Sequence, residues 1–488
     1  MTSIRIDLDR TLGNVDRRIF GGFVEHLGRC VYGGIYEEGS PLSDGNGFRR
    51  DVLGAAKDLR MPLLRWPGGN FVSGYHWADG IGPRGERPRR PDLAWNTVEP
   101  NHFGTDEFMT YCRELGTEPY LCLNMGTGTL DEALAWVEYC NGSGDTYWAD
   151  RRRQNGREEP YAVRYWGLGN EMWGDWQIGS LSAEEYVAKA VRWAKALRRL
   201  DPEIVLVSCG QDGWSEWDRI VIDGLVKHVD FHSIHIYTGS DDYWTNVLEP
   251  HQVERALRTC QTLIDRARHL QQVDRPVHVA YDEWNVWFAG RANRDEHYSL
   301  ADALAVATYL NAFVRQCQSV RIANLAQMVN VIAPIFTDEN GLFLQTIYHP
   351  LRLAAEHTQD VALDVHVDCD TVEHTDARDA AHRIADLGPF PLLDVAATRD
   401  SDRSRVVVSV VNRSLDEPVK ATLEVADAAP SGRVVARVVT GDDVDLRNSF
   451  DRPDAVTVTE HTSTGSGLVQ YEFPPHSYTQ LDIMIGAQ

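Results

Sequence analysis

The alternation of short apolar segments with longer amphipathic ones is the feature that most constrains the fold. Segments predicted as strands recur at 19–25, 63–66, 119–124, 164–169, 204–208, 231–237, 277–282 and 322–329. Segments between them, such as 183–199 and 253–270, carry apolar residues at i, i+3, i+4 and i+7, which is typical of helices with one buried face. Strands that alternate with helices form parallel sheets with right-handed crossovers. Eight such units predict an α/β fold, a (β/α)₈ TIM barrel with insertions.

An open, doubly wound sheet is the rival architecture. Such a sheet would normally carry a phosphate or dinucleotide fingerprint after its first strand. Here that place holds Glu25-His26-Leu27-Gly28-Arg29. A G-x-G-x-x-G match at 80–85 follows no predicted strand and opens no predicted helix, so it is not expected to bind a dinucleotide.

The pattern changes after about residue 357. Alternating segments predicted as strands lie at 361–372, 405–411, 421–425, 433–439, 455–458 and 469–473, separated by Asp, Pro, Gly and Asn turns. This pattern is typical of a β-sandwich. Residues 3–8 also alternate, and we expect them to complete that sandwich. The predicted organisation is an N-terminal sandwich strand (1–15), a catalytic barrel (16–357) and a C-terminal β-sandwich domain (358–488).

Charge and cysteine content exclude several classes of protein. The net charge of −24 disfavours binding to nucleic acid or to anionic membrane surfaces. The longest apolar run, 301–314, is too short and too polar to cross a bilayer, and the N-terminus lacks a signal-peptide pattern. The eight cysteines show no close pair, so we expect a cytoplasmic protein without disulfides. No metal and no cofactor are predicted, because His232 and His235 point to opposite faces of a strand.

Two carboxylates stand at the ends of predicted strands, where barrel enzymes place their active sites. Glu171 follows the fourth strand and Glu283 follows the seventh. Two carboxyl groups that flank a glycosidic bond are what retaining hydrolysis requires: one attacks the anomeric carbon, and the other protonates the leaving oxygen and later deprotonates water. The alternative is that each glutamate pairs structurally with a nearby arginine such as Arg65.

Several segments resemble glycoside hydrolase family 51, the α-L-arabinofuranosidases. The clearest are YWGLGNEMWGDWQIG at 165–179 and YDEWNVW at 281–287; similar segments lie at 20–37, 64–77, 95–104, 323–335 and 473–483, in the family's order along nearly the whole chain. The resemblance implies that Glu171 is the acid/base and Glu283 the nucleophile. It also implies a homo-oligomer, commonly a hexamer.

The resemblance assigns further residues to the substrate. Asn170 would bind the sugar 2-hydroxyl and Tyr237 would orient Glu283, while Trp95 and Trp287 would be walls for the leaving group. The remaining contacts to furanose hydroxyls would come from Glu25, Asn70 and Gln327. Several of these residues have a structural alternative: a salt bridge to Arg29 or Arg65 for Glu25, a turn cap for Asn70, and packing for Tyr237, Trp95 and Trp287.

Trp173 departs from the family pattern. Many relatives carry an acidic residue followed by glycine at this place, whereas this chain has Trp173-Gly174-Asp175. An indole beside the acid/base would stack on the sugar of the leaving group. With Trp66, Trp95, Trp284 and Trp287, it suggests that tryptophans gather where a sugar binds.

The expected function is that of a retaining, exo-acting α-L-arabinofuranosidase. It would release terminal non-reducing arabinofuranosyl residues from arabino- and arabinoxylo-oligosaccharides by double displacement. Two alternatives stay open: a related retaining glycosidase that cleaves β-xylosides or β-glucans, and a non-catalytic sugar-binding barrel.

Overall fold

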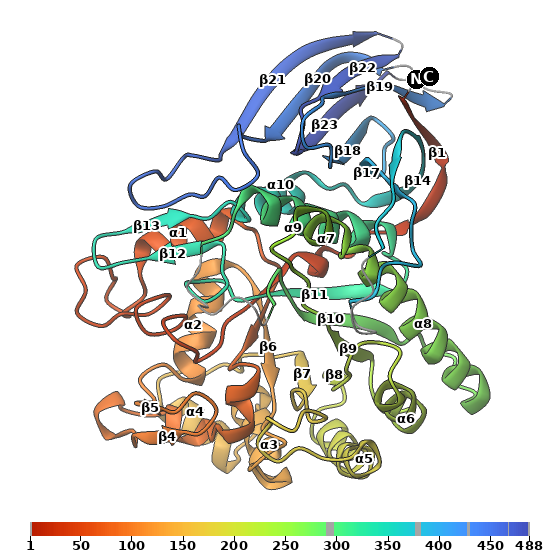
Figure 1. The fold of residues 1–488 in the computed structure, drawn as a ribbon. Coiled ribbons are helices and arrows are strands. Elements are labelled where there is room, and N and C mark those ends of the chain that lie inside the picture. Colours follow the sequence, from red (N-terminus) through yellow and green to blue (C-terminus); the bar gives the residue numbers. More distant parts are fainter. Residues whose placement is uncertain (1, 289–296, 376–381, 427–429, 467, 487–488) are drawn as a thin grey trace.

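The computed structural model describes residues 2–288, 297–375, 382–426, 430–466 and 468–486. Eight parallel strands close into a barrel, which confirms the predicted fold class (Figure 1). In barrel order they are β2 (Gly21–Phe23), β3 (Leu63–Trp66), β6 (Glu118–Cys122), β7 (Tyr165–Leu168), β8 (Val205–Ser208), β9 (Phe231–His235), β10 (His278–Trp284) and β11 (Val320–Ala326). Each of the eight predicted strands overlaps one of these.

Helices surround the barrel. They are α1 (Arg50–Asp58), α2 (Thr105–Leu115), α3 (Leu130–Asn141), α4 (Tyr147–Gln154), α5 (Ala183–Leu200), α6 (Glu216–Leu225), α7 (Tyr243–Leu248), α8 (His251–Gln271), α9 (Leu300–Arg315) and α10 (Tyr348–His357). The amphipathic segments predicted at 183–199 and 253–270 lie within α5 and α8. None of the helices among the described residues is long and apolar enough to cross a membrane.

Short elements lie in the connections of the barrel and of the C-terminal unit. The 3-10 helices are η1 (Arg17–Phe20), η2 (Asn70–Gly74), η3 (Trp77–Gly80) and η4 (Arg84–Glu86). Small hairpins pair β4 (Arg90–Asp92) with β5 (Thr97–Glu99), β12 (Ile335–Thr337) with β13 (Leu342–Leu344), and β15 (Thr371–Val372) with β16 (Phe390–Pro391).

A second, all-β unit contains nine strands in one hydrogen-bonded sheet. In sheet order they are β21 (Val458–Ser466), β20 (Pro430–Val439), β23 (Ser477–Ile485), β18 (Arg405–Asn412), β17 (Leu393–Arg399), β14 (Val361–Asp368), β1 (Thr2–Asn14), β19 (Val419–Ala426) and β22 (Val469–Phe473). One apolar core joins Ile4, Leu423 and Leu481, which come from both halves of the sheet, so the sheet folds over itself as a sandwich.

The N-terminal strand completes this sheet, as predicted. Ile4 pairs with Val367 of the antiparallel neighbour β14 and with Leu423 of the parallel neighbour β19. The domain boundaries at 15/16 and 357/358 stay a prediction.

Helix α9 joins the two units. All its residues from Leu300 to Val314 are buried. Tyr309 and Phe313 pack in the barrel core, whereas Leu300 and Leu304 share a cluster with Val411 of β18 and Tyr478 of β23. The apolar run noted in the sequence is therefore an internal helix between barrel and sandwich.

Candidate active site

The carboxylates of Glu283 and Glu25 meet beside a glycine at the carboxyl end of the barrel. A Cβ atom placed on Gly69, just beyond β3, would lie 3.3 Å from Oε2 of Glu283, 3.4 Å from Oε2 of Glu25 and 3.5 Å from Nδ2 of Asn170. Side chains from the ends of β2, β7 and β10 therefore converge on one backbone position. Only a residue without a side chain leaves the space between them open.

Glu283 is held from three sides. Tyr237 donates its hydroxyl to Oε1 at 2.8 Å, and Nη1 of Arg65 lies 3.0 Å from Oε2. Nδ1 of His235 is 3.7 Å from Oε2. Burial and repulsion from Glu171 raise the pKa of Glu283, while His235, Arg65 and Tyr237 oppose that rise. The predicted contact between Tyr237 and Glu283 is thus present.

Glu171 uses its two oxygens differently. Oε1 lies 3.0 Å from Nδ1 of His235, and Oε2 accepts the indole N–H of Trp176 at 3.3 Å. The residue has a left-handed backbone, with φ of 42°. Glu171 lies three residues beyond the end of β7, and its carboxylate is within 4.8 Å of ligand atoms of His235 and Glu283.

His235, at the end of β9, links both glutamates to the barrel interior. Its Nε2 lies 3.1 Å from Oδ1 of Asp282. Burial opposes an imidazolium, yet the carboxylates of Glu283, Asp282 and Glu171 raise the pKa of His235 to about 10. His235 falls near the end of the strand predicted at 231–237, but no role in the site was predicted for it. Period-two alternation puts it on the same face of that predicted strand as Ser233 and Tyr237, which is the sequence signal that could have identified it.

Arg65 is the buried cation at the base of the site. It contacts Glu283 as described, donates to the Asp282 carbonyl at 3.1 Å and reaches Oδ1 of Asn170 at 2.5 Å. Its guanidinium lies over the Phe23 ring, 4.6 Å from the centroid. The ion pair between Glu283 and Arg65, which was the structural alternative to a catalytic role, is therefore present, and it lies inside the same cluster as the other site residues.

Asn170 presents an unused donor. Its side chain is buried, Oδ1 is taken by Arg65, and Nδ2 has no hydrogen-bond partner among the described residues. This Nδ2 faces the space above Gly69. A buried N–H without a partner is costly, so the arrangement favours a ligand oxygen at this place.

Glu25 is bound by neutral donors. Oε1 accepts the backbone N–H of Phe71 at 3.1 Å and the indole N–H of Trp95 at 3.2 Å, and Oε2 accepts Nε2 of Gln327 at 3.0 Å. Burial and the charge of Glu283 raise the pKa of Glu25 to about 7. The structure therefore brings Glu25, Gln327 and Trp95 together as predicted. The salt bridges considered for Glu25 are absent from the described residues, because Arg29 and Arg65 have other partners.

The other predicted contacts surround this cluster. Asn70 opens η2 directly after Gly69 and is partly exposed. Trp287 packs edge-on against Tyr237, with ring centroids 6.1 Å apart, and its indole N–H has no hydrogen-bond partner among the described residues.

The tryptophans divide differently from what the sequence suggests. Trp66 and Trp284 are fully buried and belong to the core, because they alternate with the inward-facing Arg65 and Glu283. The expectation that they line a sugar site is wrong. Trp173 is partly buried and donates to the Gly210 carbonyl at 2.9 Å. Trp176, for which no role was predicted from the sequence, is 55% exposed, and its indole contacts Glu171.

Among the described residues, one group has the spacing of metal ligands. Glu171, His235 and Glu283 each offer an atom, all within 4.8 Å of one another. A protonated His235 has no free lone pair for a metal, and Arg65 already supplies positive charge. The absence of a metal stays a prediction.

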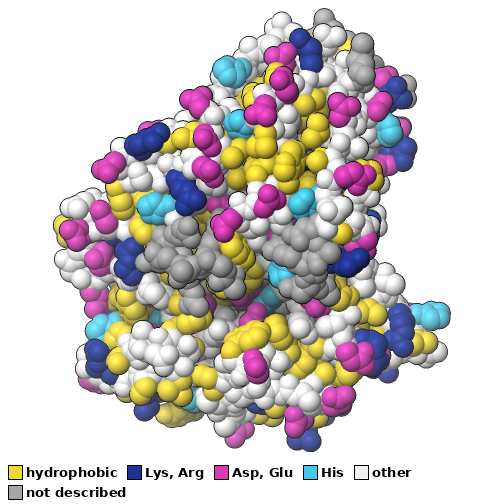
Figure 2. All heavy atoms as spheres, viewed as in Figure 1, with side chains coloured by type: hydrophobic (Ala, Val, Ile, Leu, Met, Phe, Trp, Pro, Cys, Tyr) yellow, Lys and Arg dark blue, Asp and Glu magenta, His cyan; other side chains and the backbone are white. Residues whose placement is uncertain are grey.

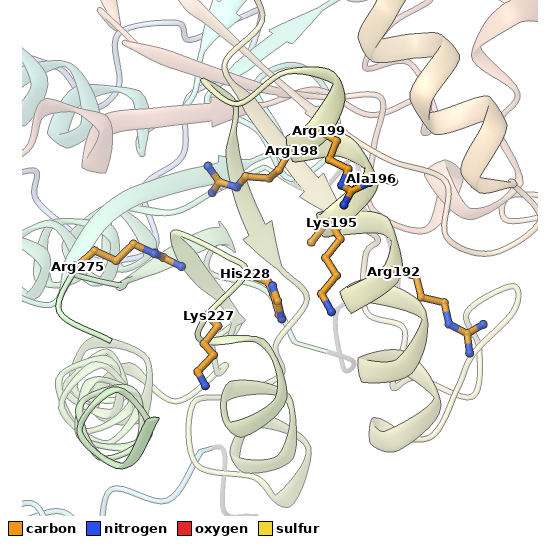
Figure 3. Close-up of a pocket in the computed structure, with 9 residues that line it drawn as sticks. Arg192, Lys195, Ala196, Arg198, Arg199, Lys227, His228 and Arg275 are labelled. Carbon is orange, nitrogen blue, oxygen red and sulfur yellow. The ribbon is translucent and has the colours of Figure 1, made fainter. Parts of the chain in front are cut away.

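A separate hollow of about 740 Å³ is basic (Figure 3). It is lined by Arg192, Ala194, Lys195, Ala196, Arg198, Arg199, Lys227, His228 and Arg275. Arg198 and Arg275 are paired with Asp230, and the hollow includes none of the predicted site residues. Acidic side chains, by contrast, are spread over the face seen in Figure 2 without gathering into one patch.

A parallel barrel with two acidic side chains at its carboxyl end is the arrangement of a glycoside hydrolase, and comparisons with known proteins agree. Residues 55–255 match the model "Alpha-L-arabinofuranosidase 1 domain", and residues 282–477 match "Alpha-L-arabinofuranosidase C-terminal domain". The chain is 47% identical to "Probable alpha-L-arabinofuranosidase C" of Aspergillus clavatus, over 98% of this chain and 96% of that protein.

Two bacterial proteins extend the likeness. The "Intracellular exo-alpha-(1→5)-L-arabinofuranosidase" of Halalkalibacterium halodurans is 37% identical over 84% of this chain and 85% of that protein. The crystal structure of the α-L-arabinofuranosidase from Thermotoga maritima in complex with arabinose superposes with a TM-score of 0.91 at 41% identity, covering 99% of this chain and all of that one. The chain belongs to the α-L-arabinofuranosidases of glycoside hydrolase family 51.

Proposed function

We propose that the chain is a retaining, exo-acting α-L-arabinofuranosidase in which Glu283 is the nucleophile and Glu171 the acid/base. The observation that carries the proposal is the closeness of the two carboxylates, each with an oxygen within 4.8 Å of the other. Retaining enzymes hold their carboxyl groups about 5–5.5 Å apart, whereas inverting enzymes need about 6.5–9.5 Å to admit a water molecule.

The proposed reaction has two steps. Glu283 attacks the anomeric carbon as Glu171 gives its proton to the leaving oxygen, which forms a glycosyl-enzyme ester and releases the rest of the oligosaccharide. Glu171 then takes a proton from water, whose oxygen displaces Glu283 from the same carbon. Tyr237 and Arg65 orient the nucleophile by binding its two oxygens.

The remaining contacts would fix one terminal furanose ring. The unpartnered Nδ2 of Asn170 is placed to bind the 2-hydroxyl, a contact that strengthens as positive charge develops on the ring. Buried Glu25 and Gln327, with the adjacent Asn70, would take other hydroxyls. Trp95, Trp287 and Trp173 are proposed near the leaving group. Polar groups this deeply buried suit a single end residue, which supports exo action.

The substrates, location and assembly are proposed by analogy with the family. Arabinofuranosyl oligosaccharides are supported by the names of the relatives, and exo action and an intracellular location are named for the Halalkalibacterium protein. Eight free cysteines are consistent with the reducing cytoplasm. We also propose a homo-oligomer, which light scattering on the purified protein would test.

The deciding experiment is a panel of defined arabino- and xylo-oligosaccharides with NMR detection of the first-formed anomer. The proposal expects release of α-L-arabinofuranose before mutarotation. Release of the β-anomer would contradict retention, and rapid cleavage of an aryl β-xyloside without cleavage of the aryl arabinofuranoside would favour the alternative glycosidase.

Equal hydrolysis by wild type and Glu283→Ala would contradict the nucleophile assignment. Azide should restore turnover to that variant.

A further inference from the structure

The indole of Trp176 is folded back over a glycine. A Cβ atom on Gly174 would lie 2.6 Å from Cε2 and 2.7 Å from Cζ2 of the Trp176 ring, so the ring occupies the place of a side chain at position 174. The turn itself is closed by the Gly174 N–H, which donates to the Glu171 carbonyl at 2.8 Å. This packing directs the indole N–H to Oε2 of Glu171, 3.3 Å away.

The two oxygens of Glu171 are not equivalent as sites for a proton. His235, whose pKa is raised by its carboxylate neighbours, carries hydrogen on both ring nitrogens when charged, so its Nδ1 donates to Oε1. Each oxygen of Glu171 accepts one N–H, but the imidazolium is a charged donor and binds an unprotonated oxygen more strongly than a neutral indole does. The transferable proton therefore belongs on Oε2, where the Trp176 N–H occupies one lone-pair direction and leaves the other for the hydroxyl.

Trp173 packs against Trp176 and restrains its position. Its ring meets Trp176 edge to face, with centroids 5.0 Å apart and planes at 85°. Its own N–H is fixed on the Gly210 carbonyl, and its ring packs against the barrel core. Trp176 is 55% exposed, so few other contacts restrain it. The contact with Trp173 therefore limits the rotamers that the Trp176 side chain can adopt.

We propose that Trp176 is a positioning residue for Glu171, which directs the proton on Oε2 toward the leaving oxygen, and that Trp173 holds Trp176 in place. The inference rests on the proposed acid role of Glu171. It assigns the unusual indole at position 173 to control of proton delivery rather than to stacking on a sugar.

Three arabinofuranosides distinguish a role of Trp176 in proton transfer from a role in stacking on a sugar. The measured quantity is kcat/KM, which reports the first bond cleavage. The 2,4-dinitrophenyl glycoside needs no proton on its leaving group. The methyl glycoside needs one but has no second ring. The α-1,5-linked arabinobiose needs a proton and has a second ring. For Trp176→Phe we expect a roughly tenfold loss on the methyl glycoside and arabinobiose, and less than a twofold loss on the dinitrophenyl glycoside.

Position 173 offers a matched pair. Trp173→Ala should show the same selectivity with a smaller loss than Trp176→Phe, and Trp173→Phe, which keeps a ring against Trp176, should lose less than Trp173→Ala on the methyl glycoside and arabinobiose. Trp148, in α4, packs its ring against Trp77, and Trp148→Phe controls for the replacement of a tryptophan by phenylalanine. Thermal unfolding of each variant shows that it is folded.

Other patterns would overturn the inference. A loss on arabinobiose and the dinitrophenyl glycoside but not on the methyl glycoside would make Trp176 a stacking surface. An equal loss on all three would make it a structural residue. Glu171→Gln is measured in the same panel. If its kcat/KM for the methyl glycoside does not fall selectively, by roughly 10²-fold or more, then the acid role of Glu171 itself is wrong, and not only the positioning role of Trp176.

Discussion

The hydroxyl of Tyr237, two residues beyond the end of β9, donates across 2.8 Å to Oε1 of Glu283 in the neighbouring strand β10. The bond favours the ionised carboxylate, which a nucleophile must be. It is one of the contacts that oppose the rise in the pKa of Glu283 caused by burial.

Tyr237→Phe removes this bond and leaves the ring against Trp287. Because the ionised form of Glu283 loses a donor, its pKa should rise further, and the acidic limb of kcat/KM should move to higher pH. At the optimum we expect roughly a tenfold lower kcat/KM. Tyr147→Phe, at a site that is 67% exposed, is the control. An acidic limb that stays in place would show that the hydroxyl does not stabilise the charged nucleophile.

Glu25 should make stability depend on pH near neutrality. Its pKa is raised from 4.5 to about 7 in the folded protein, so the native state keeps a proton that the unfolded chain releases. The protonated Glu25 therefore adds to the free energy of unfolding. This stabilisation is fully present below pH 4.5 and is lost as pH rises toward 7, and its full size is about 3 kcal/mol.

Glu25→Gln cannot titrate, so its free energy of unfolding should fall less than that of wild type between pH 5 and pH 7.5. Urea unfolding at both values measures the difference, with the exposed Glu118→Gln as control. Parallel behaviour of Glu25→Gln and wild type would mean that Glu25 does not hold this proton.

Arg65→Met removes one of the two buried cationic side chains, Arg65 and His235, that Asp282 and Glu283 share. Removing one partner from a buried ionic cluster costs about 3–5 kcal/mol, so we expect a loss of stability of that order in urea unfolding. Arg60→Met breaks an ion pair with Glu356 whose arginine side chain is 56% exposed, and should change stability by less than about 1 kcal/mol. Similar losses in the two variants would refute the structural role of Arg65.

Asn170→Ala should act through the sugar 2-hydroxyl. The variant is expected to lower kcat/KM for an aryl arabinofuranoside by roughly 10²-fold, and by a much smaller factor for the 2-deoxy analogue, because that analogue lacks the partner of Nδ2. Each factor compares variant and wild type on the same substrate, so differences in reactivity between the two substrates cancel. An equal factor on both substrates would mean that Asn170 acts through Arg65, which also contacts its side chain, and not through the 2-hydroxyl.

The barrel could be predicted because each of its strands is a short apolar run flanked by amphipathic helices. The sandwich was harder to predict. Strand β21 (Val458–Ser466) is an edge strand with polar residues on both faces, so the sequence placed a strand at 455–458 instead. Strand β17 (Leu393–Arg399) went unpredicted, since it is buried along nearly its whole length and shows no alternation.

Much of the candidate site was visible as polar residues at strand ends. The connections between them were not, because they depend on how the barrel closes. His235 joins Glu171 to Asp282 across three strands, and Trp176 reaches Glu171 only because the chain turns back at Gly174. Trp66 and Trp284 were misassigned because one residue of offset along a strand separates the barrel interior from the layer under the helices.

The position of β1 in the middle of its sheet has a consequence for biosynthesis. One neighbour of this strand begins at Val361 and the other ends at Ala426, so an early strand has no partners until most of the chain has been made. The barrel can assemble while the ribosome is still at work, but the sheet that covers α9 closes late. Until then, the apolar face of α9 that later meets Val411 and Tyr478 stays open to water or to chaperones.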